Sequence, residues 1–452
     1  MQAALVGFAA VLVLALLGIP LGFTLIVVGI IGFAAMRSSM VGGSLIAFGD
    51  KGLSIDWQSL SGAAAMAGQQ MFDVSTSYGL TVIPLFVLMG AFIHRADLST
   101  NLYDGANAFL GHRRGGLAMS TIAACGGFAA VCGSSIATAA TMARVAMPSM
   151  RRFGYADSLS TGSIAAGGTL GILIPPSVPL VIYGILAEAD IGKLFIAGVI
   201  PGILLSSLFI GAIALQTALN PAIGPAGERT AWPERLRAMS RIWGVVLLFA
   251  VIIGGIYFGI FTPTEAAGIG AAGAFLFALW RGNLGWRGTY DALVESGITT
   301  GMIFVVTFGA LIFSNFITIA GMTAEITEWI ESLQAPPLGV VLAMCLVYVL
   351  LGCVFDSLAM LILTVPIFAA IVGPMGVDLI WFGIVVIIVV ELGLITPPIG
   401  MNVFVVASIV PETSIWTIFR GVWPFVIAMV FGLALILVFP PLATWLPGLM
   451  GR

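Results

Sequence analysis

The stretch GILIPPS at residues 171–177 returns as GLITPPI at residues 393–399, in the other half of the chain. Each stretch interrupts a long apolar segment with a Pro-Pro pair. Proline lacks an amide donor and pushes the residue before it out of helical geometry, so a helix must unwind at such a pair. The two stretches therefore predict two broken helices, over 160–187 and 377–409.

The chain around these breaks is too apolar for a water-soluble protein. Of its 452 residues, 60% are hydrophobic and 8% are charged, and the mean hydropathy is +1.15. A membrane span needs roughly 20 apolar residues, so we expect an all-α polytopic membrane protein with room for about ten to twelve spans. The net charge of −3 and the thin spread of 17 Lys and Arg exclude a nucleic acid as partner.

An interrupted apolar segment precedes each break and predicts a re-entrant helical hairpin. The first hairpin, 115–142, is interrupted at residues 133–135, and the second, 338–372, at Asp356 and Ser357. In four pairs of identical residues, the two members are separated by the same number of positions, which we call the offset between the halves. The pairs are Gly171 and Gly393, Pro175 and Pro397, Pro176 and Pro398, and Ser135 and Ser357. We therefore predict two repeats, over 1–219 and 242–452, joined by a polar linker over 220–241.

Apolar runs predict the remaining helices. They lie at 4–19, 20–36, 79–96, 191–219, 242–261, 263–280, 297–321 and 413–439, with a polar amphipathic stretch at 37–78. Thr262, Pro263 and Glu265 form the pattern of a capping box at the start of one helix.

Charged residues predict opposite orientations for the two repeats. Arginines flank the first hairpin on both sides, which places its mouth on the cytoplasmic side together with the linker 220–241: Arg113, Arg114, Arg144, Arg151 and Arg152. The second hairpin lies in the range 288–419, which contains no Lys or Arg, and Glu325, Glu328 and Glu331 precede it. Its mouth should therefore face outside, which makes the repeats inverted.

Inverted repeats with broken helices are a common way for secondary transporters to build a central site, because unwound backbone leaves carbonyls free for cations. We therefore expect the site where both hairpin tips meet both breaks. Asp356 is costly in an apolar hairpin unless it is paired or solvated. It is a sodium ligand or proton carrier, a polar cap on the following helix, or both. Glu391 is a coupling-ion or relay residue, or a structural partner.

Hydroxyl side chains surround the predicted breaks and supply hard oxygen ligands that suit an alkali cation. They are Ser134, Ser135, Thr138, Ser357 and Thr396, with Asn402 as a further side chain that faces the same cavity. The alternative for each hydroxyl is a bond back to a carbonyl of its own helix.

Other kinds of function lack the residues that they need. The two histidines, His94 and His112, lie near predicted helix ends, so no base is available at depth for a serine nucleophile. The chain has no Walker motif. Neither an intramembrane enzyme nor a passive channel is favoured. The four cysteines are not spaced as CxxC pairs, which predicts buried free thiols: Cys125, Cys132, Cys345 and Cys353.

Four motifs carry a resemblance to a known family. They are GGFAAVCGSSIATAA at 126–140, GTLGILIPPS at 168–177, FTPTEAA at 261–267 and ELGLITPPIGMN at 391–402. Over essentially its full length the chain resembles the large membrane subunit (M subunit, DctM-type) of the tripartite ATP-independent periplasmic (TRAP) transporters.

This resemblance implies an elevator-type, sodium-coupled importer of a carboxylate in a bacterial or archaeal inner membrane, with a C4-dicarboxylate, a sialic acid, another sugar acid or a keto acid as the substrate. It implies three partners besides the lipid bilayer: a small four-helix membrane subunit, a periplasmic substrate-binding protein and the carboxylate solute. It implies Na⁺ as coupling ion and no other cofactor. No further four-helix segment is recognisable in the sequence, so the small subunit is expected to be a separate chain. The alternative is a self-sufficient sodium- or proton-coupled carboxylate symporter that needs no binding protein.

The resemblance also implies where the ligands bind. One sodium site would use Ser134, Ser135 and backbone from Gly171 to Pro175. The other sodium site would use Asp356, Ser357, Thr396 and backbone from Gly393 to Pro397. The substrate carboxylate would lie between the tips, near Ser135, Ser177, Ser357 and Pro398.

Overall fold

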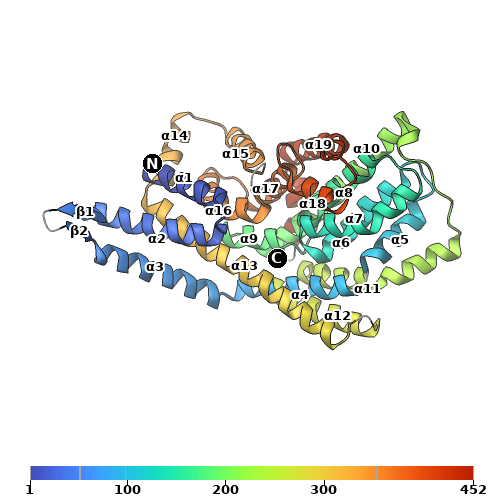
Figure 1. Ribbon diagram of the computed structural model, residues 1–452, viewed down its shortest axis with the longest axis horizontal. Helices are drawn as coiled ribbons and strands as arrows, with labels where there is room; N and C mark the ends of the chain where they lie inside the picture. Colours follow the sequence, from blue (N-terminus) through green and yellow to red (C-terminus); the bar gives the residue numbers. More distant parts are fainter. Residues whose placement is uncertain (1, 50–51, 97, 283, 353–354, 451–452) are drawn as a thin grey trace. The chain divides into compact units, whose positions relative to one another are not determined.

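The computed structural model describes residues 2–49, 52–96, 98–282, 284–352 and 355–450. Most of these residues are helical. The α-helices are α1 (Gln2–Leu16), α2 (Leu21–Met40), α3 (Trp57–Thr76), α4 (Val82–Arg95), α5 (Leu98–Leu110), α6 (Gly116–Cys132), α7 (Ser135–Arg152), α8 (Asp157–Leu173), α9 (Val178–Leu186), α10 (Ile191–Leu219), α11 (Trp232–Tyr257), α12 (Pro263–Trp280), α13 (Trp286–Ile319), α14 (Met322–Ser332), α15 (Pro337–Gly352), α16 (Ser357–Val372), α17 (Leu379–Gly393), α18 (Met401–Ile409), α19 (Ile415–Val438) and α20 (Pro441–Gly448). Figure 1 labels most of them.

The chain divides into two compact units. The smaller unit contains Met1–Leu80, Gly297–Ala343 and Leu361–Val377, and the larger unit contains Thr81–Ser296, Met344–Met360 and Asp378–Arg452. Each unit takes segments from both sides of the predicted linker 220–241. The hairpin tips and the breaks all belong to the larger unit.

In the smaller unit, α2 and α3 lie side by side and are joined by an antiparallel pair of strands, β1 (Ile46–Gly49) and β2 (Gly52–Ile55) (Figure 1). This short hairpin departs from the prediction of a purely helical chain. The polar stretch 37–78 holds glycines at 42, 43, 49 and 52, which favour a turn over a continuous helix. Asp56 then caps α3, because its Oδ1 accepts the Ser59 amide at 3.1 Å.

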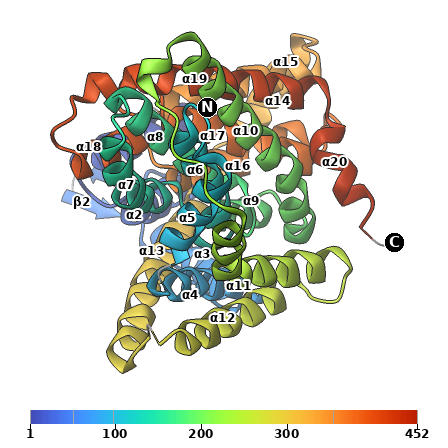
Figure 2. The same cartoon turned by 90° about the vertical axis from the view of Figure 1, so that its right-hand side faces the viewer.

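The larger unit is built around α8. This helix is buried along its whole length from Leu159 onward, because α6, α7 and α19 pack against it. The helix α17 is buried from Trp381 to Gly393. Figure 2 shows α4 and α12 side by side, and α4 also packs against α6. The first broken helix and α17 thus lie largely inside protein, where unwound backbone is tolerated in a membrane, whereas Pro397 and Pro398 of the second break are exposed.

The order and bounds of the helices recur along the chain. With the offset that relates Gly171 to Gly393, α7 and α16 begin at equivalent positions, and so do α8 and α17. The bounds of α6 and α15, of α9 and α18, and of α10 and α19 agree closely at the same offset. The predicted second hairpin, 338–372, matches α15 and α16 closely, and the helices predicted at 191–219 and 263–280 have the bounds of α10 and α12.

The prediction was wrong at the end of the first hairpin. We predicted its end at residue 142, whereas α7 continues to Arg152. Its buried residues, among them Met142, Ala146 and Met150, follow helical spacing and face protein, so the arginines on the other face do not end the helix. The correct first hairpin is therefore α6 and α7.

The predicted linker 220–241 was also too long, because α11 begins at Trp232 and not at residue 242. Pro233 and Glu234 lie in its first turn and favour a helix start. The Arg235 guanidinium lies over the rings of Phe109 and Trp232, at 5.7 and 5.1 Å from their centroids. Aromatic packing thus buries a charge that the sequence indicated as exposed linker. In the same way α13 begins at Trp286 and not at residue 297.

Several features complete the comparison with the sequence. The capping box predicted at Thr262 and Glu265 is present. Cys125, Cys132 and Cys345 are free thiols, while Cys353 lies outside the described residues. The helices α3, α5, α14 and α20 were not predicted from the sequence. Over the described residues, six helices are long and apolar enough to cross a membrane, or seven if the bent pair α8 and α9 is one span.

Candidate functional site

The tip of the first hairpin is a tight turn held by a serine cap. Gly133 ends α6 with φ of 62°, a conformation that favours glycine. Ser134 is extended and begins α7, and its Oγ accepts the Ala137 amide at 3.3 Å. A side-chain cap of this kind satisfies one of the first free amides of a helix.

The tip of the second hairpin has the same construction with a carboxylate. Asp356 Oδ1 accepts the Ala359 amide at 3.2 Å. The offset that relates the two breaks also carries Ser134 to Asp356 and Ala137 to Ala359. Asp356 is therefore a cap on α16, which was one of the two roles predicted for it. This hydrogen bond uses only the Oδ1 atom of Asp356, so the carboxyl group can still act as the predicted cation ligand.

The two breaks differ in length. The first lies between α8 and α9, which meet at an angle of 45°, and Ser177 caps α9 by accepting the Leu180 amide at 3.5 Å. The second runs from α17 to α18, where the Thr396 hydroxyl donates to the Gly393 carbonyl at 3.2 Å. The bonds Pro175–Pro176 and Pro397–Pro398 are both cis.

The first hairpin tip contacts the break of its own half. A Cβ atom built on Gly171 would lie 2.7 Å from both the Ser134 carbonyl oxygen and Thr138 Oγ1. A Cβ on Gly133 would lie 3.4 Å from the Pro176 carbonyl oxygen. The absence of side chains at these glycines lets two backbones approach, so hydroxyl and carbonyl oxygens gather at one place.

The second hairpin contacts its own break through a pair of glycines. A Cβ on Gly393 would lie 2.7 Å from Gly352 Cα, so the end of α15 lies directly against the end of α17. Gly352 shortly precedes Asp356 in the chain. The intervening Cys353 and Val354 lie outside the described residues.

One contact joins the two halves of the sequence and was not predicted. The Ser135 hydroxyl donates to Glu391 Oε1 at 2.5 Å, and both residues are 1% exposed. Glu391 thus partners with the first hairpin and not with the second break, which begins shortly after it. No sequence pattern pairs residues that are 256 positions apart.

The surroundings of this contact contain unpaired polar atoms. Asn402 Nδ2 donates to the Ala165 carbonyl at 3.4 Å, and a Cβ on Gly168 would lie within 3.2 Å of both this Nδ2 and the Ser135 carbonyl oxygen. Three buried atoms have no hydrogen-bond partner among the described residues: Glu391 Oε2, Thr138 Oγ1 and Asn402 Oδ1. Oxygens without a partner can coordinate a cation or accept a hydrogen bond.

The predicted substrate residues differ in their exposure. Ser135, Ser177 and Ser357 are buried, with 1%, 0% and 9% exposed surface, whereas Pro398 is exposed. A cavity of about 490 Å³ lies beside the second break and is lined by Ser158, Pro397, Trp416, Thr417, Phe419, Arg420 and Trp423. Of these residues, only Pro397 was predicted from the sequence to belong to a site. The sequence does contain a pattern that could have indicated this cavity, because Arg420 ends a stretch without Lys or Arg and lies between two tryptophans.

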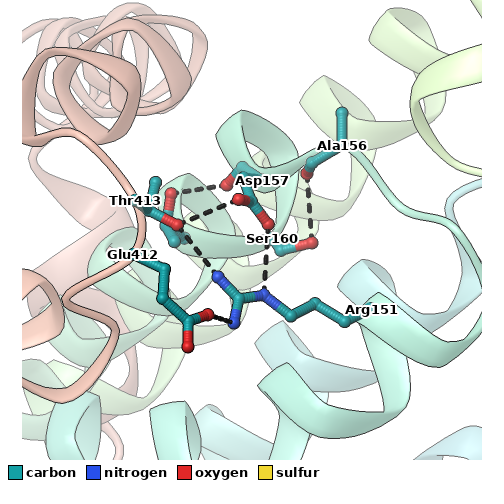
Figure 3. A network of polar contacts seen from close by, with 7 residues as sticks. Arg151, Ala156, Asp157, Ser160, Glu412 and Thr413 are labelled. Atoms are coloured by element: carbon teal, nitrogen blue, oxygen red, sulfur yellow. Dashed lines mark hydrogen bonds and ion pairs between the residues drawn. The ribbon is translucent and has the colours of Figure 1, made fainter.

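A polar network next to the cavity joins α7, α8 and the segment before α19 (Figure 3). Arg151 pairs with Asp157, with 3.4 Å between Nε and Oδ1, and also with Glu412. Thr413 accepts from the same guanidinium at 3.2 Å and donates to Asp157 at 3.0 Å. This network ties the first hairpin to the second half of the sequence.

The side chains at the tips limit the kind of cation that they can hold. No group of three His, Cys, Asp or Glu side chains lies together within the described part of the chain. The oxygens that do gather are hydroxyls, carbonyls and single carboxylates. These hard donors suit an alkali cation better than a transition metal.

A comparison with known proteins agrees with this arrangement. The family described as "Tripartite ATP-independent periplasmic transporter, DctM component" matches residues 8–442. The chain belongs to this family. The DctM-family chain is therefore a multi-pass protein of the inner membrane, a component of a transporter and not an enzyme.

Curated relatives of this DctM-family chain carry different substrates in their names. The C4-dicarboxylate TRAP transporter large permease protein DctM of Pseudomonas aeruginosa is 36% identical over 384 residues, which are 84% of this chain and 89% of that protein. The ectoine/5-hydroxyectoine protein UehC of Ruegeria pomeroyi is 32% identical and covers 96% of both chains. The sialic acid protein SiaM of Vibrio cholerae is 32% identical over 85% of this chain and 89% of that protein.

A solved structure supports the fold. The crystal structure of the Alcanivorax borkumensis YdaH transporter matches with a TM-score of 0.64 and covers 97% of this chain and 98% of that one. The sequence identity is 14%. At this identity the likeness concerns the fold alone.

Proposed function

We propose that this chain imports an organic carboxylate by sodium symport as the large permease of a tripartite transporter. Its partners would be a small four-helix membrane subunit and a periplasmic protein that delivers the substrate. Family membership supports the tripartite arrangement. The names of the relatives in Pseudomonas aeruginosa and Vibrio cholerae support a C4-dicarboxylate or a sialic acid as substrate class.

The observation that carries sodium coupling is the matched pair of tips. Ser134 and Asp356 occupy equivalent positions and cap the second arm of their hairpins in the same way. Gly171 lies against Ser134, and Gly393 lies against Gly352, which shortly precedes Asp356 in the chain. One sodium ion is assigned to Ser134, Ser135 and the backbone from Gly171 to Pro175. The other is assigned to Asp356, Ser357, Thr396 and the backbone from Gly393 to Pro397.

The proposal includes an inverted relation between the two halves and an elevator movement. The recurrence of helix bounds with one offset supports a repeat, and the arginines around the first hairpin support its cytoplasmic mouth. In the elevator, the two hairpins and the two broken helices move together as the part that carries substrate. The Ser135–Glu391 bond joins segments of both halves within that part, and the Arg151 network joins α7 to the segment that follows the second broken helix.

The experiment is a thermal unfolding measurement of the purified chain in NaCl, KCl and choline chloride at equal ionic strength. A ligand at about 100 times its dissociation constant stabilises a protein by roughly 2.7 kcal/mol, which is easily measured. We expect a sodium-specific rise of the midpoint in the wild-type chain. We expect a smaller rise in Asp356→Asn, because asparagine keeps the helix cap and removes the charge.

Asp190→Asn is the matched control for this variant. Asp190 caps α10 by accepting the Lys193 amide at 3.0 Å, away from the tips. It should retain the full sodium response. Equal responses of wild-type, Asp356→Asn and Ser134→Ala chains would remove the assignment of sodium to the hairpin tips.

A self-sufficient symporter, coupled to sodium or protons, is the alternative. Uptake into vesicles that contain the chain with its small subunit separates the two functions. The tripartite function requires that uptake depends on added binding protein. Uptake at the same rate without binding protein would establish the alternative.

A further inference from the structure

The cavity beside the second break is built from two helices that pack very closely. The helix α19 runs along α8, and Gly421 lies against the backbone of Ser158, where a Cβ would be 2.7 Å from its carbonyl carbon. This approach brings Arg420 and Thr417, which lie near Gly421 on α19, to the first turn of α8. The close packing therefore fixes one charged and two hydroxyl side chains around the same space.

The cavity is continuous with the second break. Phe419 packs on Gly400, where a Cβ would lie 3.1 Å from Phe419 Cε1, and Gly400 begins α18. Pro397, the central residue of the break, lines the same cavity. A molecule in this space would thus touch the segment to which the second sodium ion is assigned.

Arg420 has no acidic partner in the described part of the chain. Its guanidinium makes no hydrogen bond or ion pair there. The two carboxylates nearest in sequence to the lining segments, Asp157 and Glu412, are both held by Arg151 (Figure 3). Arg420 is exposed, and no carboxylate of the described residues neutralises its positive charge beside the cavity.

The remaining wall suits a small organic molecule. The hydroxyls of Ser158 and Thr417 make no side-chain hydrogen bond among the described residues, so they are available to a ligand. Trp416, Phe419 and Trp423 provide aromatic surface. The volume of about 490 Å³ falls within the range of typical small-molecule sites, which combine apolar walls with a few polar groups.

We propose that this cavity binds the carboxylate of a small organic anion, with Arg420 as its counter-charge and the hydroxyls of Ser158 and Thr417 as donors. The proposal rests on the proposed function and names the place where that function's substrate is held. A guanidinium recognises a carboxylate with two parallel hydrogen bonds, which gives both strength and orientation. Because Pro397 borders the cavity, the anion and the second sodium ion would lie on two sides of one short segment.

The test is thermal unfolding of the purified chain in constant NaCl, with succinate, a sialic acid or ectoine added against chloride at equal ionic strength. These probes represent the substrate classes in the names of the relatives. At least one probe should raise the midpoint of the wild-type chain. In Arg420→Gln, the concentration that gives half of this rise should increase about ten- to a hundredfold, as expected for loss of a charge-assisted hydrogen bond.

Two further variants make the result specific. Arg420→Lys keeps the charge but not the two-pronged geometry, so it should restore part of the affinity. Arg152→Gln removes an exposed positive charge at the end of α7, outside the cavity, and should bind the probe like the wild-type chain. If Arg152→Gln and Arg420→Gln lose the same affinity for the probe, the cause is the general surface charge, and the proposal is overturned.

The sodium response separates this proposal from the proposed function. A wild-type chain that responds to sodium but to none of the probes would overturn the cavity assignment and leave sodium coupling standing. A carboxylate response that disappears in Arg420→Gln would support the cavity even if no cation preference were found. If phosphatidylglycerol in mixed detergent micelles stabilises the wild-type chain through Arg420 and no carboxylate does, the cavity is a lipid site and the proposal fails.

Discussion

The Ser135 hydroxyl and the Glu391 carboxyl group share a hydrogen bond of 2.5 Å between two segments that are 256 positions apart, and both residues are almost completely buried. A buried acidic group that loses its partner incurs a desolvation cost that nothing offsets. The bond therefore contributes to the stability of the fold because it gives the buried Glu391 carboxyl group a hydrogen-bond donor.

Ser135→Ala should destabilise the chain by about 1–3 kcal/mol, because the Glu391 carboxyl would remain buried without a donor. The double variant Ser135→Ala/Glu391→Leu should recover part of this loss. Denaturant unfolding in detergent measures both. Ser163→Ala is the control, since Ser163 bonds only to the Ser160 carbonyl of its own helix. Equal losses in Ser135→Ala and Ser163→Ala would contradict the role of the bond.

Alanine at either close-approach glycine should cost about 1–3 kcal/mol of stability, as overpacking does. A Cβ at Gly171 would overlap Ser134 and Thr138, and a Cβ at Gly393 would overlap the Gly352 backbone. Gly254→Ala in α11 is the control because nothing lies within 4 Å of its Cβ position, so alanine there should stabilise the helix. Thermal midpoints that rise in all three variants would show that the tips are loosely packed.

The Arg151 network should contribute little to stability, at most about 1 kcal/mol for each ion pair. The side chains of Arg151, Asp157 and Glu412 are 35%, 39% and 73% exposed, so water and salt screen their charges. A double-mutant cycle with Arg151→Gln and Glu412→Gln measures the coupling between them. The coupling should fall in high salt, and a coupling that salt leaves unchanged would contradict this interpretation.

The start of α3 should loosen in acid. Hydrogen bonds from Ser59 lower the pKa of Asp56 below its usual value of 3.8. A lowered folded-state pKa contributes stability that is present above the unfolded-state pKa and is lost as the pH falls through the folded-state value. The protection of the Ser59 amide, which is its exchange rate compared with the intrinsic rate at the same pH, should therefore fall below about pH 4. Asp56→Asn keeps a capping side chain that does not titrate, so exchange there should not depend on acid in this way.

Much of the helical framework could be predicted because the features that end helices are local. Glycine, proline and serine at residues 133–135, 171–177 and 393–399 fix the interruptions within a few residues, since each acts on the backbone next to it. The extension of α7 to Arg152 could not be predicted from apolar runs, because a helix that faces protein on one side tolerates arginines on the other. The beginning of α11 at Trp232 has the same cause.

The site was predicted in part, and the missing part depends on packing. The contact of the first tip with its own break was predicted and is confirmed by Gly171 and Ser134. The pairing of Ser135 with Glu391 and the cavity at Arg420 were not predicted. Both result from helices that are far apart in the sequence and whose contacts depend on where α17 and α19 pack. The assignment of sodium and substrate to these residues stays a prediction.

The constant offset between the two halves makes Asp356 the equivalent of Ser134 and Glu391 the equivalent of Thr169, so the acidic member of each pair belongs to the second half. For a chain that binds a cation at each tip, the two binding events are electrically unequal. A cation beside Asp356 cancels a charge, whereas a cation beside Ser134 adds one. Membrane voltage does work on net charge, at roughly 2.3 kcal/mol per charge for each 100 mV. In the loaded carrier the voltage would therefore act mainly through the ion of the uncharged tip, whereas in the empty carrier it would act on the charge of Asp356 during the return step.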